Sequence, residues 1–526
     1  MKTTIHFISI IMLFSSLTLT LKAEEKLILI SIGKDAYQGL IKENIMDTNI
    51  HKTILDDGEV VVTQITESDI PRMTHYIHHE LKRCGGFMVH SSISEAQLAM
   101  SAFNKKASTE IKAVNYSIDN GNMVNLLHTA LIEQNIVNTI SSLTSFTNRY
   151  YSTISGKESA EWIKNNWDAL TSSRNDIRVE FFSHSAFQQN SVIATIEGTR
   201  FPNEVIVVGG HLDSTAGFSP SETTRAPGAD DDASGIATIT EVLRAIAATG
   251  FKPERTIKMM GYAAEEVGLR GSQDIAQNFK QQGINVIGVL QLDMTNYKGS
   301  AEDILLLTDN TNTAQNQFLS DLAETYQNVN LDYTRCGYAC SDHASWHNQG
   351  FAASMPFEAR MGEHNQAIHT SSDTLAQSNN QAAHAMNFAR LAASYIAELA
   401  KGTNGDDNPE PPNPPNEEIT ETFTGSVVRN QEQHYGPFNL EPNSHYNVQL
   451  SGDNDADLYV HFGQRPTSTL YTCRPWINGS AESCTGAASN TTMYVMVRGY
   501  SSTTSNFRVD VTYRTQTIIA KKMQKK

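Results

Sequence analysis

Residues 204–214 read Glu-Val-Ile-Val-Val-Gly-Gly-His-Leu-Asp-Ser, an apolar run that stops at two glycines and is followed by polar side chains. Further apolar runs of similar length occur at 256–262, 286–292 and 304–307. Such runs are typical of strands that are buried on both faces of a sheet. Residues 204–214 therefore predict a central strand with a histidine at its carboxyl end.

Helical patterns separate these runs, at 233–248, 271–282, 314–326 and 380–400. Alternating strands and helices predict an α/β domain over residues 116–401, a three-layer sandwich around a mainly parallel mixed sheet. Ligands of such folds bind at the carboxyl ends of the strands, so the polar side chains that follow each run are the candidates for a functional site.

The segments before this domain differ from it in character. Residues 1–23 have a basic start and an apolar stretch of about 17 residues, which predicts a secretory signal peptide; a membrane anchor is the alternative. Residues 24–115 contain one strand-like run at 26–32 and one helix-like run at 92–106. We interpret 24–115 as a small α+β propeptide, and a permanent N-terminal domain is the alternative.

After the α/β domain the composition and the hydrophobic pattern of the sequence change. Residues 402–417 form a Pro-rich linker that is predicted to be a stiff, solvated spacer. Residues 418–515 carry short runs that alternate polar and apolar side chains between polar turns, which predicts an all-β sandwich domain. Residues 516–526 are a short tail.

Composition limits the classes of function. The chain has 526 residues and a net charge of −17, so it has room for about three folding units but lacks the basic surplus of a nucleic-acid-binding protein. Two of the five cysteines, Cys336 and Cys340, are natural local partners, as are Cys473 and Cys484; Cys84 is left alone. An exported chain can form such disulfides, and the alternative is that all five stay reduced.

Five separate segments of the α/β domain carry side chains that bind metals. They present His211 with Asp213, the aspartates 230–232, the glutamates 265–266, Asp293 and His369. The two glycines before His211 are expected to let the backbone turn tightly, and three adjacent aspartates repel one another unless a cation or a helix N-terminus compensates them. Taken alone, helix capping, a solvated glutamate pair and a structural histidine are the alternatives. Together, carboxylates with two imidazoles and no cysteine favour a zinc site that does chemistry.

These segments, in this order, resemble the secreted bacterial leucyl aminopeptidases with a co-catalytic di-zinc centre. The resemblance extends over most of residues 116–401 and includes Ser141-Ser-Leu, Phe146-Thr-Asn-Arg149 and the stretch 336–347. Residues 452–466 resemble the bacterial pre-peptidase C-terminal domain, and residues 24–115 resemble the propeptide of the family more loosely.

The resemblance implies a role for each site residue and two Zn²⁺ ions. His211 and Asp293 would bind one zinc, Glu266 and His369 the other, and Asp231 would bridge them. Glu265 would be the general base that acts on a metal-activated water, and Asp213 would orient His211. Tyr338, held by a disulfide between Cys336 and Cys340, would stabilise the tetrahedral intermediate.

The family holds the first side chain of the substrate in an apolar pocket, and Met294, Met355, Phe357 and Ile368 retain that character. Met361 and His364 replace the usual aromatic residues, and Glu363 lies beside them. Methionine adapts to more shapes than phenylalanine does, and a glutamate at the rim would favour a basic side chain. We therefore expect a Leu-like preference first and a Lys/Arg preference as the alternative.

The sequence thus predicts a metallo-aminopeptidase, a hydrolase that removes N-terminal residues from peptides and proteins outside a bacterial cell after passage through the periplasm. It is expected to be monomeric after processing, with no nucleic-acid partner and no stable membrane anchor. A carboxypeptidase or a cyclase with the same site is a second enzyme hypothesis. A non-catalytic adhesin or carbohydrate-binding protein would have lost metal ligands, and none is lost.

Overall fold

The computed structural model describes residues 27–83, 85–104, 116–404, 418–440 and 444–514. The chain divides into two compact units, Met1–Asp406 and Asp407–Lys526. The predicted signal peptide, the predicted tail, Cys84 and residues 405–417 of the predicted linker lie outside the described residues. None of the described helices combines the length and the apolar character that crossing a bilayer requires.

The larger unit is built on a six-stranded sheet with the order β13-β10-β7-β9-β6-β5. Its strands are β5 (Ile177–Phe182), β6 (Ser191–Ile196), β7 (Phe201–His211), β9 (Arg255–Tyr262), β10 (Asn285–Gln291) and β13 (Ala353–Ser354). The β13, β10, β7 and β9 strands are parallel, β6 runs antiparallel to β9, and β5 runs antiparallel to β6. The expected mainly parallel mixed sheet is confirmed.

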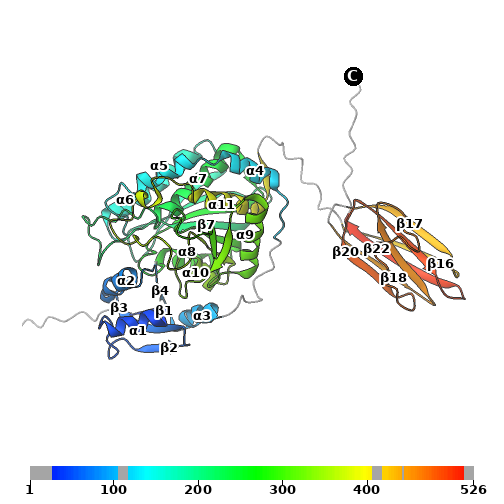
Figure 1. The fold of residues 1–526 in the computed structure, drawn as a ribbon, viewed down its shortest axis with the longest axis horizontal. Coiled ribbons are helices and arrows are strands. Elements are labelled where there is room, and N and C mark those ends of the chain that lie inside the picture. The colour runs from blue at the N-terminus through cyan, green and yellow to red at the C-terminus, as the bar shows by residue number, and fades with distance from the viewer. Residues whose placement is uncertain (1–26, 84, 105–115, 405–417, 441–443, 515–526) are drawn as a thin grey trace, which may run out of the picture. The chain divides into compact units, whose positions relative to one another are not determined.

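Helices cover both faces of this sheet (Figure 1). They are α4 (Gly121–Ala130), α5 (Glu133–Leu143), α6 (Ile154–Thr171), α7 (Ala233–Thr249), α8 (Arg270–Gln281), α9 (Thr313–Tyr326), α10 (His343–Asn348) and α11 (Ala385–Ala400). Alternate residues of β7 divide between two cores: Ile206 and Val208 pack with α7 and α11, and Val205 and Val207 pack with α8 and α10. Because side chains of a strand alternate between its faces, this division gives the three layers.

The helix that follows the aspartates begins and ends with clear signals. Asp232 is the N-cap of α7, where its Oδ1 accepts a hydrogen bond of 2.8 Å from the backbone N–H of Gly235. Gly250 ends the helix with φ +70°, a conformation in which glycine meets no Cβ penalty. The helix thus starts beside the carboxyl ends of the central strands.

Three details differ from the sequence expectations. The run at 304–307 forms β11 (Ile304–Leu307) of a separate small sheet, with β12 (Leu331–Thr334) and β14 (Pro356–Phe357) as its neighbours. The helix expected from residue 380 begins at Ala385, because a 3₁₀ turn, η2 (Leu375–Ser378), and the left-handed residues Asn379 and Asn380 precede it. Residues 402–404, which the composition assigns to the linker, form β15 (Gly402–Asn404) and pair with β8 (Phe251–Pro253).

Residues 27–104 form an α+β layer against the α/β part of the same unit. Its antiparallel sheet has the order β2-β3-β1-β4. The elements are β1 (Leu27–Gly33), α1 (Lys34–Lys42), β2 (Thr53–Asp56), β3 (Val60–Thr66), η1 (Glu67–Asp69), α2 (Ile70–His79), β4 (Phe87–His90) and α3 (Ile93–Asn104). The apolar core of this layer includes Tyr150, Ala264 and Val267 from outside it, so the layer packs on the loop that follows β9. We name residues 27–104 the N-terminal layer.

The smaller unit is an antiparallel β-sandwich, as the alternating pattern predicts. One sheet has the order β16-β22-β18-β20 and the other β17-β21-β19. The strands are β16 (Glu418–Val427), β17 (Glu432–Asn439), β18 (His445–Gly452), β19 (Ala456–Phe462), β20 (Glu482–Ala487), β21 (Thr492–Gly499) and β22 (Ser505–Arg514). A disulfide joins Cys473 to Cys484 of β20.

Candidate functional site

The sequence-predicted metal-binding residues meet at one edge of the central sheet. His211 is the last residue of β7, Asp293 follows β10 by two residues, and the pair Glu265-Glu266 follows β9. Asp231 lies just before α7. His369 comes from the loop before η2, and all of these side chains are buried. The parallel order of β10, β7 and β9 places their carboxyl ends side by side, which is the physical reason for this convergence.

Two groups of possible ligand atoms lie on either side of Asp231. His211 Nε2 is 2.9 Å from Asp231 Oδ1 and 3.5 Å from Asp293 Oδ1. His369 Nε2 is 2.9 Å from Asp231 Oδ2 and 3.2 Å from Glu266 Oε2. Each oxygen of Asp231 therefore faces a different imidazole.

One member of the site was missed by sequence reasoning. His78, on α2 of the N-terminal layer, lies with Glu266 and His369 in a group whose ligand atoms are all within 4.8 Å of one another. Its Nε2 is 3.8 Å from Glu266 Oε2, and its ring stacks on that of His369 with centroids 3.8 Å apart. The sequence does show three histidines in five residues (75, 78 and 79), but no pattern links them to Glu266 and His369, which are about 190 and 290 positions away.

The two glycines before His211 serve close packing rather than a turn. The β7 strand continues through them to His211, so the expected tight turn is absent from this described stretch. A Cβ on Gly210 would lie 2.6 Å from the carbonyl oxygen of Leu292, and one on Gly209 would lie 2.4 Å from the Tyr262 ring. Side chains at these positions would force the strand ends apart, and the ligand groups with them.

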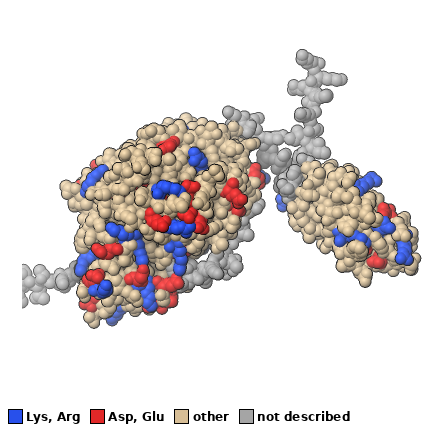
Figure 2. All heavy atoms as spheres, in the orientation of Figure 1, with Lys and Arg blue, Asp and Glu red and all other residues tan. Residues whose placement is uncertain are grey.

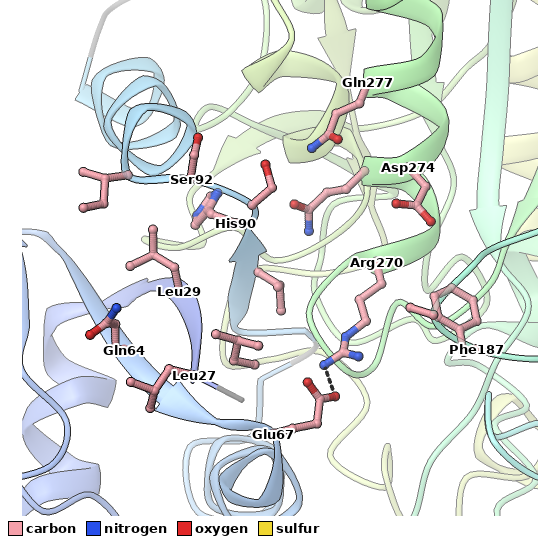
Figure 3. Close-up of a pocket in the computed structure, with 16 residues that line it drawn as sticks. Leu27, Leu29, Gln64, Glu67, His90, Ser92, Phe187, Arg270, Asp274 and Gln277 are labelled. Atoms are coloured by element: carbon pink, nitrogen blue, oxygen red, sulfur yellow. Dashed lines mark hydrogen bonds and ion pairs between the residues drawn. The ribbon is translucent and has the colours of Figure 1, made fainter. Parts of the chain in front are cut away.

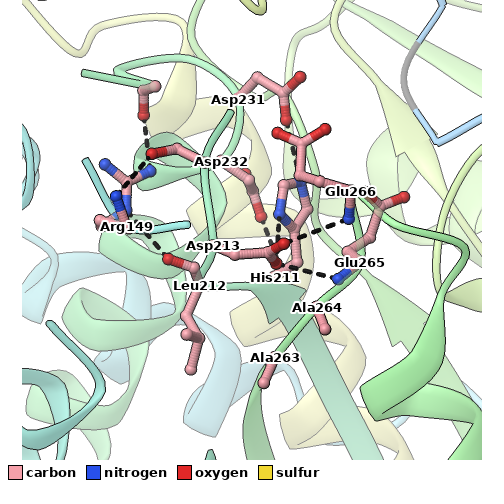
Figure 4. A network of polar contacts seen from close by, with 12 residues as sticks. Arg149, His211, Leu212, Asp213, Asp231, Asp232, Ala263, Ala264, Glu265 and Glu266 are labelled. Atoms are coloured by element: carbon pink, nitrogen blue, oxygen red, sulfur yellow. Dashed lines mark hydrogen bonds and ion pairs between the residues drawn. The ribbon is translucent and has the colours of Figure 1, made fainter. Parts of the chain in front are cut away.

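Backbone hydrogen bonds fix the site loops (Figure 4). Asp213 accepts from the N–H of Glu265 at 3.0 Å and from the N–H of Glu266 at 3.2 Å, one bond for each carboxylate oxygen. Its Oδ1 is also 3.5 Å from Nδ1 of His211. The expected contact with His211 is therefore the longest of three, and Asp213 chiefly holds the glutamate loop.

Two further buried groups hold the loop that carries Asp231. Asp373 accepts from the backbone N–H groups of Asp230 and Asp231 at 3.1 and 3.2 Å. Arg149 donates to the carbonyl oxygens of Leu212 and Gly228, which links this loop to the end of β7 (Figure 4). These contacts leave the carboxylate of Asp231 directed into the site.

The site carries more buried negative charge than its imidazoles can balance. Burial raises the pKa of Glu265 well above its usual range, and burial with the charge of Asp231 raises the pKa of Glu266 to about 7. Burial alone would lower the pKa of His369, but Glu266 and Asp231 raise it to about 10. The protein without cations thus has to hold protons on these groups.

The carboxylate oxygens and imidazole nitrogens of the site lie close together, but their contacts lack hydrogen-bond geometry. Among the described residues, no hydrogen-bond partner exists for either carboxylate oxygen of Asp231, Glu265, Glu266 or Asp293, nor for either ring nitrogen of His211 or His369. Buried polar atoms are normally satisfied, so a cluster of this size is typical of a cation-binding site. A mixed set of nitrogen and oxygen donors fits zinc.

Three residues beside the site have unusual backbone conformations. Ala264, Met294 and His369 have φ values of +55°, +56° and +57°. Non-glycine residues rarely occupy this left-handed region, and such strain is often found at functional sites. Here each strained residue directly precedes or follows a predicted ligand or catalytic side chain, or is one.

Four expected pocket residues form one buried apolar cluster beside the ligand groups. Met294, Met355, Phe357 and Ile368 pack there with Tyr338. A disulfide joins Cys336 to Cys340 and encloses Tyr338 in its short loop, as the resemblance implied. Met361 is partly buried against the same cluster.

The two remaining residues near the pocket have other contacts. His364 lies outside this cluster; its Nε2 is 3.1 Å from the carbonyl oxygen of Lys82, and its ring centroid is 5.9 Å from that of Phe357. Glu363 is exposed, and its Oε2 accepts a hydrogen bond of 2.6 Å from the hydroxyl of Ser300. The carboxylate that suggested a basic substrate is therefore on the surface.

Comparisons with known families match both units. The sequence model of peptidase family M28 matches residues 191–394, and that of the bacterial pre-peptidase C-terminal domain matches residues 434–499. A "Leucine aminopeptidase 1" of Arthroderma otae is 40% identical over 299 residues, which cover 54% of this chain and 79% of that protein. The "Leucine aminopeptidase 1" of Trichophyton rubrum is 38% identical with the same coverage. These relatives are fungal, so the family is not restricted to bacteria as the resemblance implied.

A solved structure extends the similarity. The crystal structure of the LapA aminopeptidase of Legionella pneumophila is 30% identical and superposes with a TM-score of 0.61. The similarity covers 72% of this chain and all of that chain. The structure of LapB from the same organism is 29% identical with the same TM-score and coverage.

Proposed function

Since this chain belongs to peptidase family M28, we propose that it is a secreted, zinc-dependent exopeptidase that removes single N-terminal residues with large apolar side chains. The chain is a metallo-aminopeptidase and acts on the N-termini of peptides. One observation supports the finer proposal most directly: two imidazoles and three carboxylates converge at the carboxyl ends of β7, β9 and β10.

Two zinc ions fit these residues. His211, Asp231 and Asp293 would hold one ion, and Glu266, His369 and Asp231 would hold the other. The ring nitrogens and carboxylate oxygens of both groups lack hydrogen-bond partners, and each oxygen of Asp231 faces one of the two groups. These contacts support the division. When bound, the ions would supply Lewis-acid polarisation of the peptide carbonyl and would lower the pKa of a water molecule.

Glu265 is proposed as the general base. It accepts the proton of the attacking water and delivers it to the nitrogen of the leaving peptide. Burial raises the pKa of Glu265 well above its usual range, as is typical of a carboxylate that must take up and release a proton near neutral pH. Glu266 cannot share this role, because its carboxylate is directed at His369.

Tyr338 is proposed to donate a hydrogen bond to the developing oxyanion. Its side chain is 2% exposed and lies in the cluster that contains Met294 and Phe357. A donor in a dry, fixed position stabilises negative charge more strongly than water does. The Cys336–Cys340 disulfide would restrict the loop and keep the phenol in place.

The pocket supports a preference for leucine-like side chains. Met294, Met355, Phe357 and Ile368 offer only apolar surface, and Met361 could adapt to different shapes. Glu363 is exposed and bonded to Ser300, which weakens the alternative of a Lys/Arg preference. Asp213 would act as a positioning residue for the glutamate loop.

We further propose that the enzyme works outside the cell as a monomer. The two disulfides, Cys336–Cys340 and Cys473–Cys484, suit an oxidising compartment. The apolar stretch of residues 1–23 would direct export. The N-terminal layer would be a propeptide removed before activity, and the β-sandwich of the second unit would be an accessory domain.

The proposal is tested by the hydrolysis of aminoacyl-p-nitroanilides. Protein cleaved after the N-terminal layer is offered the Leu, Phe, Lys, Arg and N-acetyl-Leu substrates, each with and without a zinc chelator. We expect chelator-sensitive cleavage of the free-amine substrates, fastest for Leu or Phe, and no cleavage of N-acetyl-Leu. Absence of turnover by folded, zinc-loaded protein would refute the proposed function, and faster cleavage of Lys would refute the pocket assignment.

A further inference from the structure

The N-terminal layer occupies the site rather than merely neighbouring it. We name residues 78–86, excluding Cys84, the closing segment. Several of its residues contact the site, and each of them contacts a different site residue. We propose that His78 is a ligand of the metal held by Glu266 and His369 in the full chain, so that the N-terminal layer closes the site by coordination. This inference rests on the proposed function, because it assigns a metal to that position.

The geometry of His78 carries the inference. Its side chain is 2% exposed, its ring lies parallel to the His369 ring within 20°, and its Nε2 is 3.8 Å from Glu266 Oε2. The nearest protein acceptor for that nitrogen is the carbonyl oxygen of Gly85 at 3.4 Å, which is at the outer limit of a hydrogen bond. An imidazole placed between a carboxylate and a second imidazole is positioned as zinc ligands are.

The rest of the closing segment covers the residues proposed for chemistry. A Cβ on Gly85 would lie 2.8 Å from Glu265 Oε1, so the segment's backbone lies directly against the proposed base. The guanidinium of Arg83 lies 4.7 Å from the centroid of the Tyr338 ring. The carbonyl oxygen of Lys82 is bonded to His364. A peptide N-terminus cannot reach Glu265 or Tyr338 while these contacts exist.

The closing segment needs its two glycines. Gly85 and Gly86 have φ values of +46° and +102°, and a Cβ on Gly86 would lie 2.4 Å from the Ile77 side chain. These glycines let the chain turn back from α2 toward β4 while remaining close to the site. The turn brings His78 and Gly85 next to each other, with His78 against Glu266 and Gly85 against Glu265.

The contacts around the segment suit a layer that is held firmly but can be removed. Ala264 and Val267, which flank the glutamates, pack into the apolar core of the N-terminal layer. Ion pairs join Arg270 to Glu67 at 2.8 Å and Arg335 to Glu59 at 2.7 Å. Figure 2 shows acidic and basic side chains interspersed over this part of the surface, as expected where ion pairs bridge two layers.

Farther from the site the packing is open. A hollow of about 890 Å³ lies between β1, β4 and the helix α8 (Figure 3). Leu27, Gln64 and His90 line it from the N-terminal layer, and Asp274 and Gln277 line it from α8. This hollow is open to solvent and separates part of the N-terminal layer from α8, whereas the shared apolar core and the closing segment join the layer to the site.

The inference is tested by the cobalt spectrum of the full chain without its predicted signal peptide. The metal-free protein is titrated with Co²⁺ alone, and the wild type is compared with His78→Ala and with His79→Ala as the matched control. His79 is on the same helix, and its ring is tilted by 39° to that of His75 with centroids 4.4 Å apart. We expect H78A to change the visible spectrum of one of two bound cobalt ions and to weaken its binding by at least about ten-fold, while H79A resembles the wild type.

Each outcome is decisive. If H78A and the wild type have the same spectrum and the same cobalt affinity, the inference is wrong. A near-ultraviolet thiolate-to-cobalt band that disappears in Cys84→Ser would also overturn it, because the ligand would then be a thiol. If H78A fails to fold, judged by circular dichroism, His78→Gln retains the bulk of the side chain and is used instead. Turnover by the cleaved wild type is measured separately, so failure of the proposed function would be seen in that assay alone.

Discussion

Replacing Asp213 by asparagine should reduce catalysis although Asp213 is not among the proposed metal ligands. Each carboxylate oxygen of Asp213 accepts one backbone N–H, from Glu265 at 3.0 Å and from Glu266 at 3.2 Å. Asparagine keeps only one acceptor oxygen, and its amide group would turn a donor toward the other N–H. One charge-assisted hydrogen bond is lost, and a buried N–H is left without its partner.

The magnitude follows from that bond. A hydrogen bond to a charged group contributes about 1.5–3 kcal/mol, and about 1.4 kcal/mol corresponds to a factor of ten in rate, so kcat/KM should fall by about 10- to 150-fold. Zinc affinity should fall as well, because Glu266 and His211 lie next to Asp213. Losses of about 10- to 100-fold are typical when a residue that orients metal ligands is changed.

The assay is hydrolysis of leucyl-p-nitroanilide by the cleaved enzyme at saturating zinc, with zinc affinity measured by competition with a chelator. Glu222→Gln is the matched control. Glu222 also accepts a backbone N–H with its carboxylate, that of Ile154 at 3.0 Å, but it is exposed and is not among the residues of the site. If D213N retains kcat/KM and zinc affinity within about two-fold of the wild type, the glutamate loop does not depend on Asp213 and the reasoning is refuted.

Three other changes test neighbouring steps of the argument. Glu265→Gln in the cleaved enzyme should lower kcat by about 10²- to 10⁴-fold while zinc content stays the same; metal analysis beside the rate assay checks this, and a loss of zinc would make Glu265 a ligand instead. Gly85→Ala in the uncleaved chain should push the closing segment away from the site and raise the rate on leucyl-p-nitroanilide, because the new Cβ would lie 2.8 Å from Glu265 Oε1. The control Gly58→Ala, whose Cβ would meet nothing within 4 Å, should leave the rate unchanged. Equal rates for the two variants would show that the closing segment does not limit access. Removing metal with a chelator should lower the Tm of the cleaved enzyme by on the order of 5–10 °C, since each ion stabilises only the folded state; an unchanged Tm in a melting scan would argue against tight binding at these residues.

The features that could be predicted are the strands and helices that local patterns of apolar and polar residues determine. The runs that became β7, β9 and β10 are apolar and bounded by glycine or polar residues, so their strand identity was readable, and parallel pairing then brings His211, the glutamate pair and Asp293 to one edge. The third layer followed from the helical patterns between the runs. The fold class was accessible in this way, and the family followed from the resemblance of the motifs.

What escaped prediction depends on packing between segments that are distant in the sequence. His78 is one of three clustered histidines on α2, and only the docking of the N-terminal layer distinguishes it from its neighbours. Similarly, the double glycine before His211 suggested a turn, but the need for glycine arises from Tyr262 on β9 and from Leu292, which directly follows β10. The principal contacts of Asp213 were missed because backbone N–H groups leave no mark in a sequence.

The loop from Ala264 to Val267 connects these observations and yields a final prediction. In the full chain it is held by the hydrogen bonds that Asp213 accepts from Glu265 and Glu266, by the bond from the N–H of Ala264 to Gln189, and by the burial of Ala264 and Val267 in the core of the N-terminal layer. Cleavage and release of that layer would expose both apolar side chains and leave these hydrogen bonds as the remaining restraints. The D213N substitution should therefore increase amide hydrogen exchange of residues 264–267 much more in the cleaved enzyme than in the full chain, where apolar packing still protects the loop. Equal increases in the two forms would mean that the N-terminal layer contributes nothing to the order of the glutamate loop, and its role would then be limited to blocking access.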